Sequence, residues 1–180
     1  MLRCLAPAFA TIVLTASILA ASPSAAQEAE VTEPPMTVQR VETIAKALDP
    51  EAQFGINGVQ LTIADVPVLI VMDPFADRMR AMVPIRDASE MTGEELARVM
   101  QANFDTALDA RYAIAQGRLW AVFIHPLSPL ERDQLISGLG QTVNIALTYG
   151  SAYSGGALSF GGGDSGALLL EELLKRGQEL

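Results

Sequence analysis

Three strand-like patterns follow one another in the first half of the chain. Residues 59–64 alternate apolar and polar side chains, which is the period of a strand with one buried face. Residues 68–72 are continuously apolar, as in a strand covered on both faces, and residues 78–85 alternate again. Because the turns at 65–67 and 73–77 are too short for crossover connections, the three strands must pair antiparallel.

Helical periodicity precedes and follows these strands. An amphipathic helix that ends at residues 49–50 is predicted from the apolar positions Val41, Ile44, Ala45 and Leu48. After the strands, Thr92 and Glu95 form a capping box, which is the signature of a helix start. We expect that helix to bury the stripe Leu96, Val99, Met100 and Phe104.

The second half of the chain predicts a hairpin and a long helix. Strand-like residues 112–115 and 119–124 flank the turn signal Gln116-Gly117. A second capping box, made by Ser128 and Glu131 with proline at the first helical position, predicts the helix start. Its expected buried face is Leu130, Leu135, Leu139, Val143 and Leu147. The order helix, three strands, helix, two strands, helix indicates an α+β fold, in which helices pack on one face of an antiparallel sheet.

The two ends differ in composition from this α+β domain, which we expect at residues 38–153. Residues 1–26 combine a positive end, an apolar run and small residues at a cleavage site, so they predict a signal peptide and a periplasmic protein. Residues 27–37 are acidic and contain paired prolines, as in a disordered leader. Residues 154–166 are expected to form a glycine-rich linker, and residues 167–180 a short amphipathic C-terminal helix.

Charge and cysteine content exclude several classes of function. The chain has 12 Lys and Arg against 21 Asp and Glu, a net charge of −9, which opposes binding to nucleic acid and to anionic lipid surfaces. The single cysteine, Cys4, lies in the predicted signal peptide, so the mature chain has no thiol chemistry. No apolar run after the signal reaches membrane-spanning length, and no metal or cofactor motif is present. We therefore expect neither an integral membrane segment nor a cofactor.

The stretch 99–104, with residues 112–114, 117–120 and 127–130, resembles the class I type III secretion chaperones and the related YbjN-like proteins. The similarity covers about residues 38–153. It consists of a helix ending near an asparagine, a strand hairpin, a Pro-Leu-Ser segment that leads into the last helix of the domain, and that amphipathic helix itself. Members of this family are small acidic homodimers that clasp an extended partner segment and have no catalytic residue. The resemblance thus implies a non-enzymatic homodimer with a polypeptide client.

Five apolar side chains are the candidate partner-binding residues. Trp120, in the predicted hairpin, suits a core or interface anchor. One side of the terminal helix carries the other four, Leu169, Leu170, Leu173 and Leu174. Because about ten residues are too few for a stable isolated helix, this helix must dock on the same molecule, on a dimer mate or on another protein.

The leading hypothesis is an exported, non-enzymatic, chaperone-like protein that holds a polypeptide segment. One alternative is a small-ligand-binding protein or a hydrolase that uses His125 with Asp133 or Asp77. A structural role for this single histidine is favoured, because proton transfer needs an oriented partner. Another alternative is an envelope structural protein that binds its own copies.

Two further motifs have simple explanations. Residues 163–166 resemble the nucleophile motif of trypsin-like proteases, with Ser165 as nucleophile, but the chain offers no matching base and scaffold. We therefore expect Asp164 or Ser165 to cap the final helix. Around the turn at 73–77, two aspartates and two arginines, Asp73, Asp77, Arg78 and Arg80, favour Asp-Arg pairing over a calcium site, which needs six to eight oxygens.

Overall fold

The computed structural model describes residues 33–56, 58–105, 108–150 and 164–177. The predicted signal peptide, the first part of the leader and most of the predicted linker lie outside these residues. The elements are α1 (Val38–Leu48), β1 (Gln53–Gly55), β2 (Gly58–Ile63), β3 (Val66–Asp73), β4 (Arg78–Asp87), the 3-10 turn η1 (Ala88–Glu90), α2 (Gly93–Asp105), β5 (Arg111–Ala115), β6 (Arg118–Pro126), α3 (Arg132–Leu147) and α4 (Asp164–Gly177). Among the described helices, none is long and apolar enough to span a membrane.

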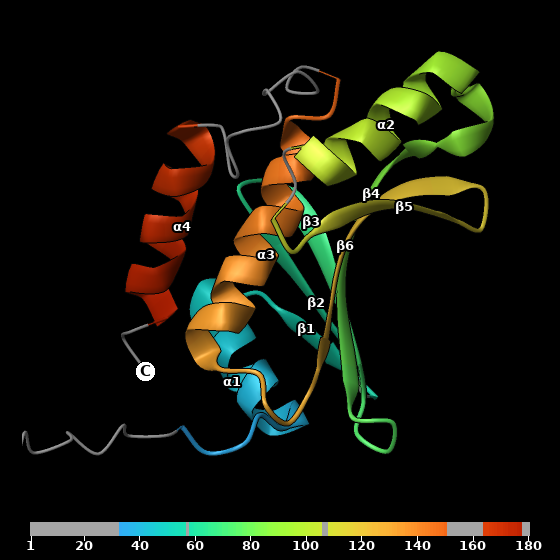
Figure 1. Ribbon diagram of the computed structural model, residues 1–180. Coiled ribbons are helices and arrows are strands. Elements are labelled where there is room, and N and C mark those ends of the chain that lie inside the picture. Colours follow the sequence, from blue (N-terminus) through green and yellow to red (C-terminus); the bar gives the residue numbers. More distant parts are fainter. Residues whose placement is uncertain (1–32, 57, 106–107, 151–163, 178–180) are drawn as a thin grey trace, which may run out of the picture. The chain divides into compact units, whose positions relative to one another are not determined.

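The predicted α+β fold is confirmed. Six strands form one antiparallel sheet in the order β1-β2-β3-β4-β6-β5, with α1 and α3 against one face (Figure 1). The element order is the predicted one, with the short edge strand β1 and the turn η1 in addition. The core lies between the sheet and these helices, where it contains Leu61, Ile70, Met79, Leu119 and Leu135.

The prediction that residues 68–72 are covered on both faces is wrong. Val68, Ile70 and Met72 of β3 are buried, whereas Val71 is 51% exposed and Leu69 is partly exposed. The helices pack on one face of the sheet, so the apolar residues of opposite parity stay at the surface. A continuous apolar run therefore marks here a strand with an uncovered hydrophobic side.

Helix α2 starts as predicted but buries a different stripe. The backbone amide of Thr92 donates to Glu95 Oε2 (2.8 Å) and that of Glu95 donates to Thr92 Oγ1 (3.2 Å), which confirms the capping box. Val99 and Ala102 are buried, whereas Met100 is 66% and Phe104 76% exposed. The expected stripe is wrong at these two positions because α2 packs beside strand β5 rather than over the sheet.

Helix α3 begins later than predicted. Glu131 is its N-cap and forms a capping box with Gln134, so the helix starts at Arg132. Ser128 instead donates from its amide and its hydroxyl to the Asp77 carboxylate, at 2.7 and 2.9 Å. Of the expected buried face, Leu130 is buried but precedes the helix, Leu135, Leu139 and Val143 are buried, and Leu147 is 56% exposed.

Two of the strand connections are tight turns with two consecutive left-handed residues. The turn after β2 is made by Ala64 and Asp65, with φ of 49° and 62°, so that Val66 already belongs to β3. The predicted turn at Gln116-Gly117 is confirmed, with φ of 52° and 72°. Two consecutive positive φ values match the right-handed twist of the strands, which fixes the pairing register.

Both ends of the described chain are held by contacts. Residues 33–37, which the sequence places in the disordered leader, are ordered: Met36 is 2% exposed and its amide donates to the Ser128 carbonyl (3.0 Å). The terminal helix α4 begins at Asp164, before the predicted start at residue 167. It packs on α3 and α1, so it docks on its own molecule (Figure 1).

Candidate functional site

The candidate site is the sheet face that α1 and α3 leave uncovered, which we call the outer face. The register places Val71 beside Arg80 and Arg80 beside Ile124, across strands β3, β4 and β6. The next row across the same strands is Leu69, Met82 and Val122. Ile124 is 55% exposed and Val71 is 51% exposed. Strand alternation thus builds two adjoining rows that expose Val71, Ile124, Leu69 and Met82 around Arg80, whereas Val122 is buried.

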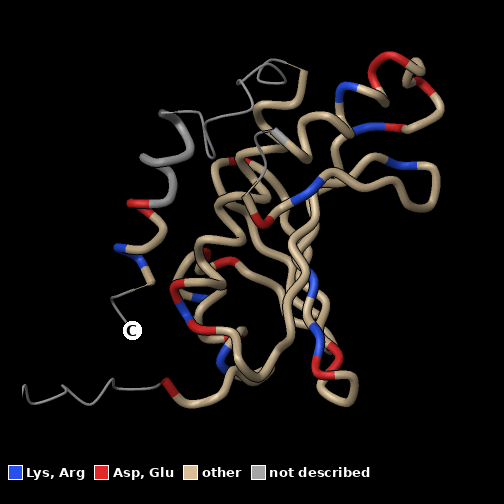
Figure 2. Tube along the Cα trace, viewed as in Figure 1, with Lys and Arg blue, Asp and Glu red and all other residues tan. Residues whose placement is uncertain are grey.

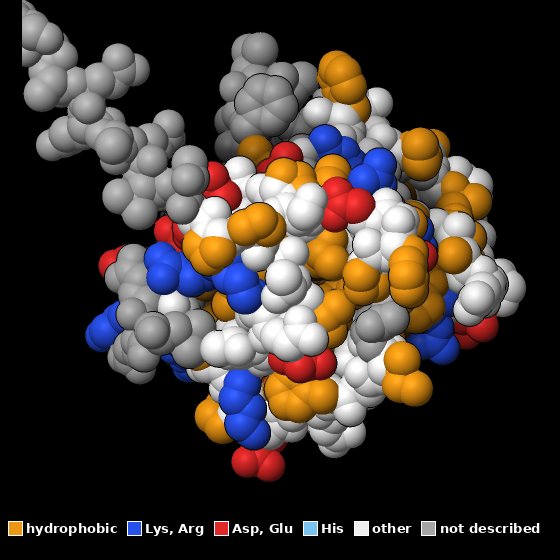
Figure 3. Space-filling model, turned by 90° about the horizontal axis from the view of Figure 1, so that it is seen from below, with side chains coloured by type: hydrophobic (Ala, Val, Ile, Leu, Met, Phe, Trp, Pro, Cys, Tyr) orange, Lys and Arg blue, Asp and Glu red, His pale blue; other side chains and the backbone are white. Residues whose placement is uncertain are grey.

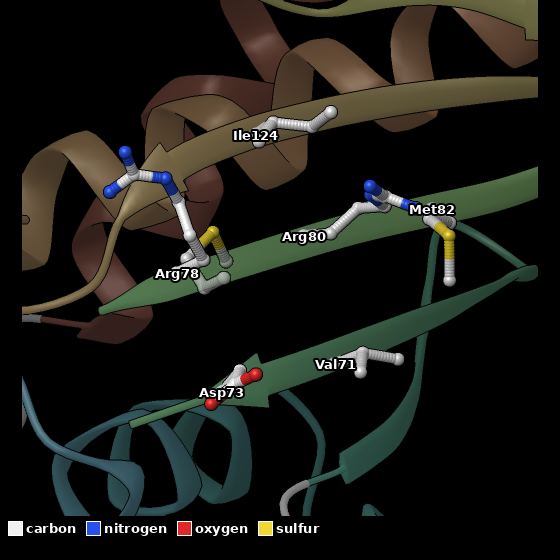
Figure 4. Close-up of a pocket in the computed structure, with 7 residues that line it drawn as sticks. Val71, Asp73, Arg78, Arg80, Met82 and Ile124 are labelled. Carbon is white, nitrogen blue, oxygen red and sulfur yellow. The ribbon is translucent and has the colours of Figure 1, made fainter. Parts of the chain in front are cut away.

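The outer face is hollowed in its middle. A recess of about 470 Å³ is lined by Val71, Asp73, Arg78, Met79, Arg80, Met82 and Ile124. Figure 4 shows the side chains of Val71, Arg80 and Ile124 on one side of three neighbouring strands, with helices on the other side. A second recess of about 340 Å³ extends toward β1 and shares Val71 with the first. The hollow therefore runs across several strands, as a long ligand requires.

Trp120, a predicted partner-binding residue, lies on this outer face. It pairs with Pro84 of β4 on one side and with Ala113 of β5 on the other. Its Nε1 donates to the Ala115 carbonyl (3.0 Å), which holds the indole against the hairpin, partly exposed. Trp120 thus extends the apolar rows toward β5, and its role in binding a partner stays a prediction.

The outer face is basic, although the chain is acidic. Four arginines occupy outward positions of the strands, namely Arg78, Arg80, Arg111 and Arg118. Within the described chain none of them lies within ion-pair distance of a carboxylate, although Arg78 lies opposite Asp73 and Arg118 opposite Asp87 in the register. Figure 2 shows most acidic residues on helices, turns and loops rather than along the strands. The face therefore offers positive charge beside apolar side chains.

The predicted Asp-Arg pairing around the β3–β4 turn is present only as neighbouring charges: Arg78 lies opposite Asp73 in the register, but Asp73 and Asp77 form no close ion pair with Arg78 or Arg80. Asp73 Oδ1 accepts the amides of Phe75 and Ala76, both at 3.0 Å. The amide and then the hydroxyl of Ser128 hold the pKa of Asp77 below its usual value of 3.8. Asp73 thus holds the backbone of its own turn, and Asp77 holds the backbone at Ser128. Among the described residues, no three His, Cys, Asp or Glu side chains are grouped as a metal site would need.

The turn ends of the sheet carry exposed hydrophobic side chains. Phe75, in the β3–β4 turn, and Ile56, between β1 and β2, are both 100% exposed. Figure 3 views the molecule from below and shows hydrophobic side chains between acidic and basic ones. Hydrophobic contact area is therefore available beyond the recess itself.

His125 lines a further recess of about 540 Å³, which adjoins the outer-face recess because both are lined by Ile124. Asp133 lines the same recess, together with Asp109, Arg111, Phe123, Ile124, Gln134 and Ser137. His125 Nδ1 is 2.8 Å from the Pro126 carbonyl, and its ring stacks on Phe123. Asp133 accepts from Arg132 Nε at 2.9 Å. The structure thus brings these two residues to one recess, whereas Asp77 bonds to Ser128 elsewhere.

Asn103 has a structural role, at the edge of the sheet, that the sequence analysis does not predict. Its Oδ1 accepts the Tyr112 amide (2.7 Å) and its Nδ2 donates to the Tyr112 carbonyl (3.0 Å). The side-chain amide thus pairs with strand β5 as a neighbouring strand would, and it joins α2 to the sheet edge. The asparagine near the end of the predicted helix was the available signal.

The four leucines of the terminal helix are described in part. Leu173 is 2% exposed and Leu174 is partly buried, both against the core. The side chains of Leu169 and Leu170, and those of Asp164 and Ser165 with their expected cap, lie outside the described part of the structure. The partner-binding role of these leucines stays a prediction.

No protein-family model matches the sequence, and no curated protein matches it. Solved structures similar to this chain include the HopA1-SchA chaperone-effector complex, at 11% identity and a TM-score of 0.48 over 64% of this chain and 96% of that chain. They also include the ExsC-ExsE complex, at 12% identity and a TM-score of 0.47 over 69% of this chain and 99% of that chain.

Proposed function

We propose that this chain is an exported, non-enzymatic, chaperone-like protein that holds an acidic, apolar polypeptide segment on the outer face of its sheet. The observation that carries the proposal is the group of exposed or partly exposed apolar side chains Val71, Ile124, Leu69 and Met82 around Arg80, which forms no ion pair in the described chain. A long recess with these properties suits a segment in which hydrophobic side chains and carboxylates lie close together.

Burial supplies the attraction and charge selects the ligand. Covering the exposed halves of Val71 and Ile124 would contribute roughly 1 kcal/mol each, with further contributions from Leu69, Met82 and Trp120. A carboxylate placed near Arg80 would find an unpaired cation beside apolar surface, where screening by solvent is reduced. Basic segments would meet like charge and bind less well.

A second copy of the chain is a poor occupant of this face. In a two-fold interface the same patch meets itself, so arginines such as Arg80 would approach one another. The expected homodimer therefore needs another surface. The exposed side chains Met100 and Phe104 of α2 and Ile114 of β5 offer one, because α2 packs beside β5.

Peptide binding with matched variants tests the proposal. The probe is a fluorescent 15-residue peptide that alternates leucine and glutamate, and its counterpart has lysine in place of glutamate. Ile124→Asp and Arg80→Glu should each weaken binding of the acidic peptide at least tenfold in fluorescence anisotropy. Leu147→Asp is the control, because Leu147 is 56% exposed against 55% for Ile124 but lies on α3. Equal loss in all three variants, or preference for the lysine peptide, would refute the proposal.

Export has its own support and its own test. The pattern of residues 1–26 supports it, since a short positive end, an apolar run and small residues precede an acidic segment. Fractionation of cells that express the full chain, followed by mass spectrometry of the N-terminus, should find a mature form beginning at Gln27 in the periplasmic fraction. An uncleaved chain in the cytoplasmic fraction would contradict export.

A second candidate function rests on the recess that His125 shares with Asp133. A small ligand or an ester could bind there, with His125 as the proton carrier. His125→Ala should then abolish turnover of a nitrophenyl ester without changing the circular dichroism spectrum. No turnover by the parental chain, or unchanged turnover by the variant, would exclude this alternative.

A further inference from the structure

Helix α4 is held by a small set of contacts on the groove between α1 and α3. Leu173 is its buried apolar anchor. Gly177, one turn later, lies so close to Ile136 that a Cβ there would collide with Ile136 Cδ1. Arg176 donates to the Leu48 carbonyl at the C-terminal end of α1 (3.5 Å), where a cation suits the helix dipole. The groove thus selects a leucine, a cation and a residue without a side chain.

The two walls of this groove have independent support. Helix α1 is fixed to the sheet by Val41 and Leu48, and α3 by Leu139 and Val143, all at most 1% exposed. Gly138 of α3 touches the Phe123 ring of β6, which brings that helix close to the sheet. These contacts do not involve α4, so we expect both walls to keep their places when α4 leaves.

The way α4 is attached to the chain favours its replacement in the groove by another helix. Residues 151–163 separate it from the rest of the described chain. A helix of 14 residues is marginal in water, so α4 is ordered by docking. For the glycine-rich linker that the sequence predicts there, we expect an effective concentration of about 1 mM, so an intrinsic dissociation constant of about 10–100 μM would keep α4 docked most of the time. A free helix with better contacts would then displace it.

We propose that the α1–α3 groove is a second polypeptide-binding site, specific for an amphipathic helix, and that α4 is its intramolecular ligand. The recognised pattern is a leucine, an arginine three residues later and a glycine directly after it, as in Leu173, Arg176 and Gly177. A partner helix with this pattern binds by displacing α4. The site is distinct from the outer face and does not depend on the function proposed for that face.

Cutting the tether tests this without changing any contact of α4. A protease site is placed between residues 155 and 160 of the full chain, and the cut protein is diluted to 0.1 μM. The C-terminal fragment should dissociate in size-exclusion chromatography, and the body should keep its melting transition within about 5 °C. A labelled peptide of residues 164–180 should then bind the body with a dissociation constant between about 1 and 100 μM, and bind the uncut chain at least tenfold more weakly.

Variant peptides show whether the groove is the site. Gly177→Leu should lower the affinity of the peptide at least tenfold, because its side chain would collide with Ile136. Glu171→Ala is the control, since Glu171 is exposed, and should bind as the parental peptide does. The proposal fails if the fragment stays bound on dilution, if the body unfolds without it, if cut and uncut proteins bind the peptide equally, or if Gly177→Leu has no effect.

Discussion

Replacing Gly138 by alanine should destabilise the fold, although alanine is the better helix former. A Cβ at this position would lie 2.5 Å from both Cδ1 and Cε1 of Phe123 and 2.8 Å from Cζ. The Phe123 ring is 4% exposed and stacks on His125, so it has little room to move. Helix α3 would therefore have to shift away from the sheet.

The magnitude follows from two opposed effects. Overpacking of a filled core costs about 1–3 kcal/mol, whereas alanine in place of glycine gains up to about 1 kcal/mol within a helix. The net loss in the free energy of unfolding should therefore be about 1–2 kcal/mol. For a domain of this size that corresponds to a fall in Tm of roughly 3–8 °C.

Urea unfolding monitored by circular dichroism measures this loss. Gly93→Ala is the control, because Gly93 is the first residue of α2 and a Cβ there meets nothing within 4 Å. It should leave stability unchanged or raise it by up to about 1 kcal/mol. In a Phe123→Leu background the cost of Gly138→Ala should fall by at least half. Stabilisation by Gly138→Ala, or an equal cost in both backgrounds, would refute the packing argument.

Three further predictions concern polar contacts. Burial raises the pKa of Tyr112 to about 12, so the protonated Tyr112 hydroxyl should stabilise the fold fully below about pH 10, and this stabilisation should disappear as the pH rises through about 12. Absorbance at 295 nm and alkaline unfolding measure this, and a Tyr112 that titrates near 10 would contradict it. Because the pKa of Asp77 is lowered in the folded state, the ionised carboxylate stabilises the fold above the usual pKa of 3.8, and this stabilisation is lost as the pH falls. Asp77→Asn should therefore flatten the acid dependence of the free energy of unfolding, measured with urea between about pH 3 and 7. An unchanged dependence would speak against it. Asn103→Ala should cost about 1–3 kcal/mol and speed hydrogen exchange of the Tyr112 amide; unchanged exchange would show that Asn103 does not protect the strand edge.

The order of elements could be predicted because each one has a local signal. Alternation marked β2 and β4, the pair Gln116-Gly117 marked the β5–β6 turn, and Thr92 with Glu95 marked the start of α2. Strand β1 has three exposed residues and no periodicity, so nothing local indicated it. The local sequence predicts a capping box at Ser128, because the actual partner of Ser128, Asp77, lies 51 residues away in the chain.

The candidate site was harder to predict, since it depends on which faces the helices leave open. A helical stripe containing Met100 and Phe104 has the same pattern whether it is buried or exposed. Apolar residues on both sides of β3 likewise leave open whether helices cover one face or two. Trp120 is a plausible anchor from its size alone, but its place between Pro84 and Ala113 depends on the register of β4, β5 and β6.

The charge distribution lets the chain repel its own copies and still attract an acidic client. A net charge of −9 keeps copies of the chain apart and would also repel an acidic client at long range. The outward arginines of β4, β5 and β6 reverse the sign of the field locally, within about one Debye length of 8 Å at physiological salt. Salt should therefore act mainly on the rate of association, whereas the apolar rows beside Arg80 determine how long the segment stays bound.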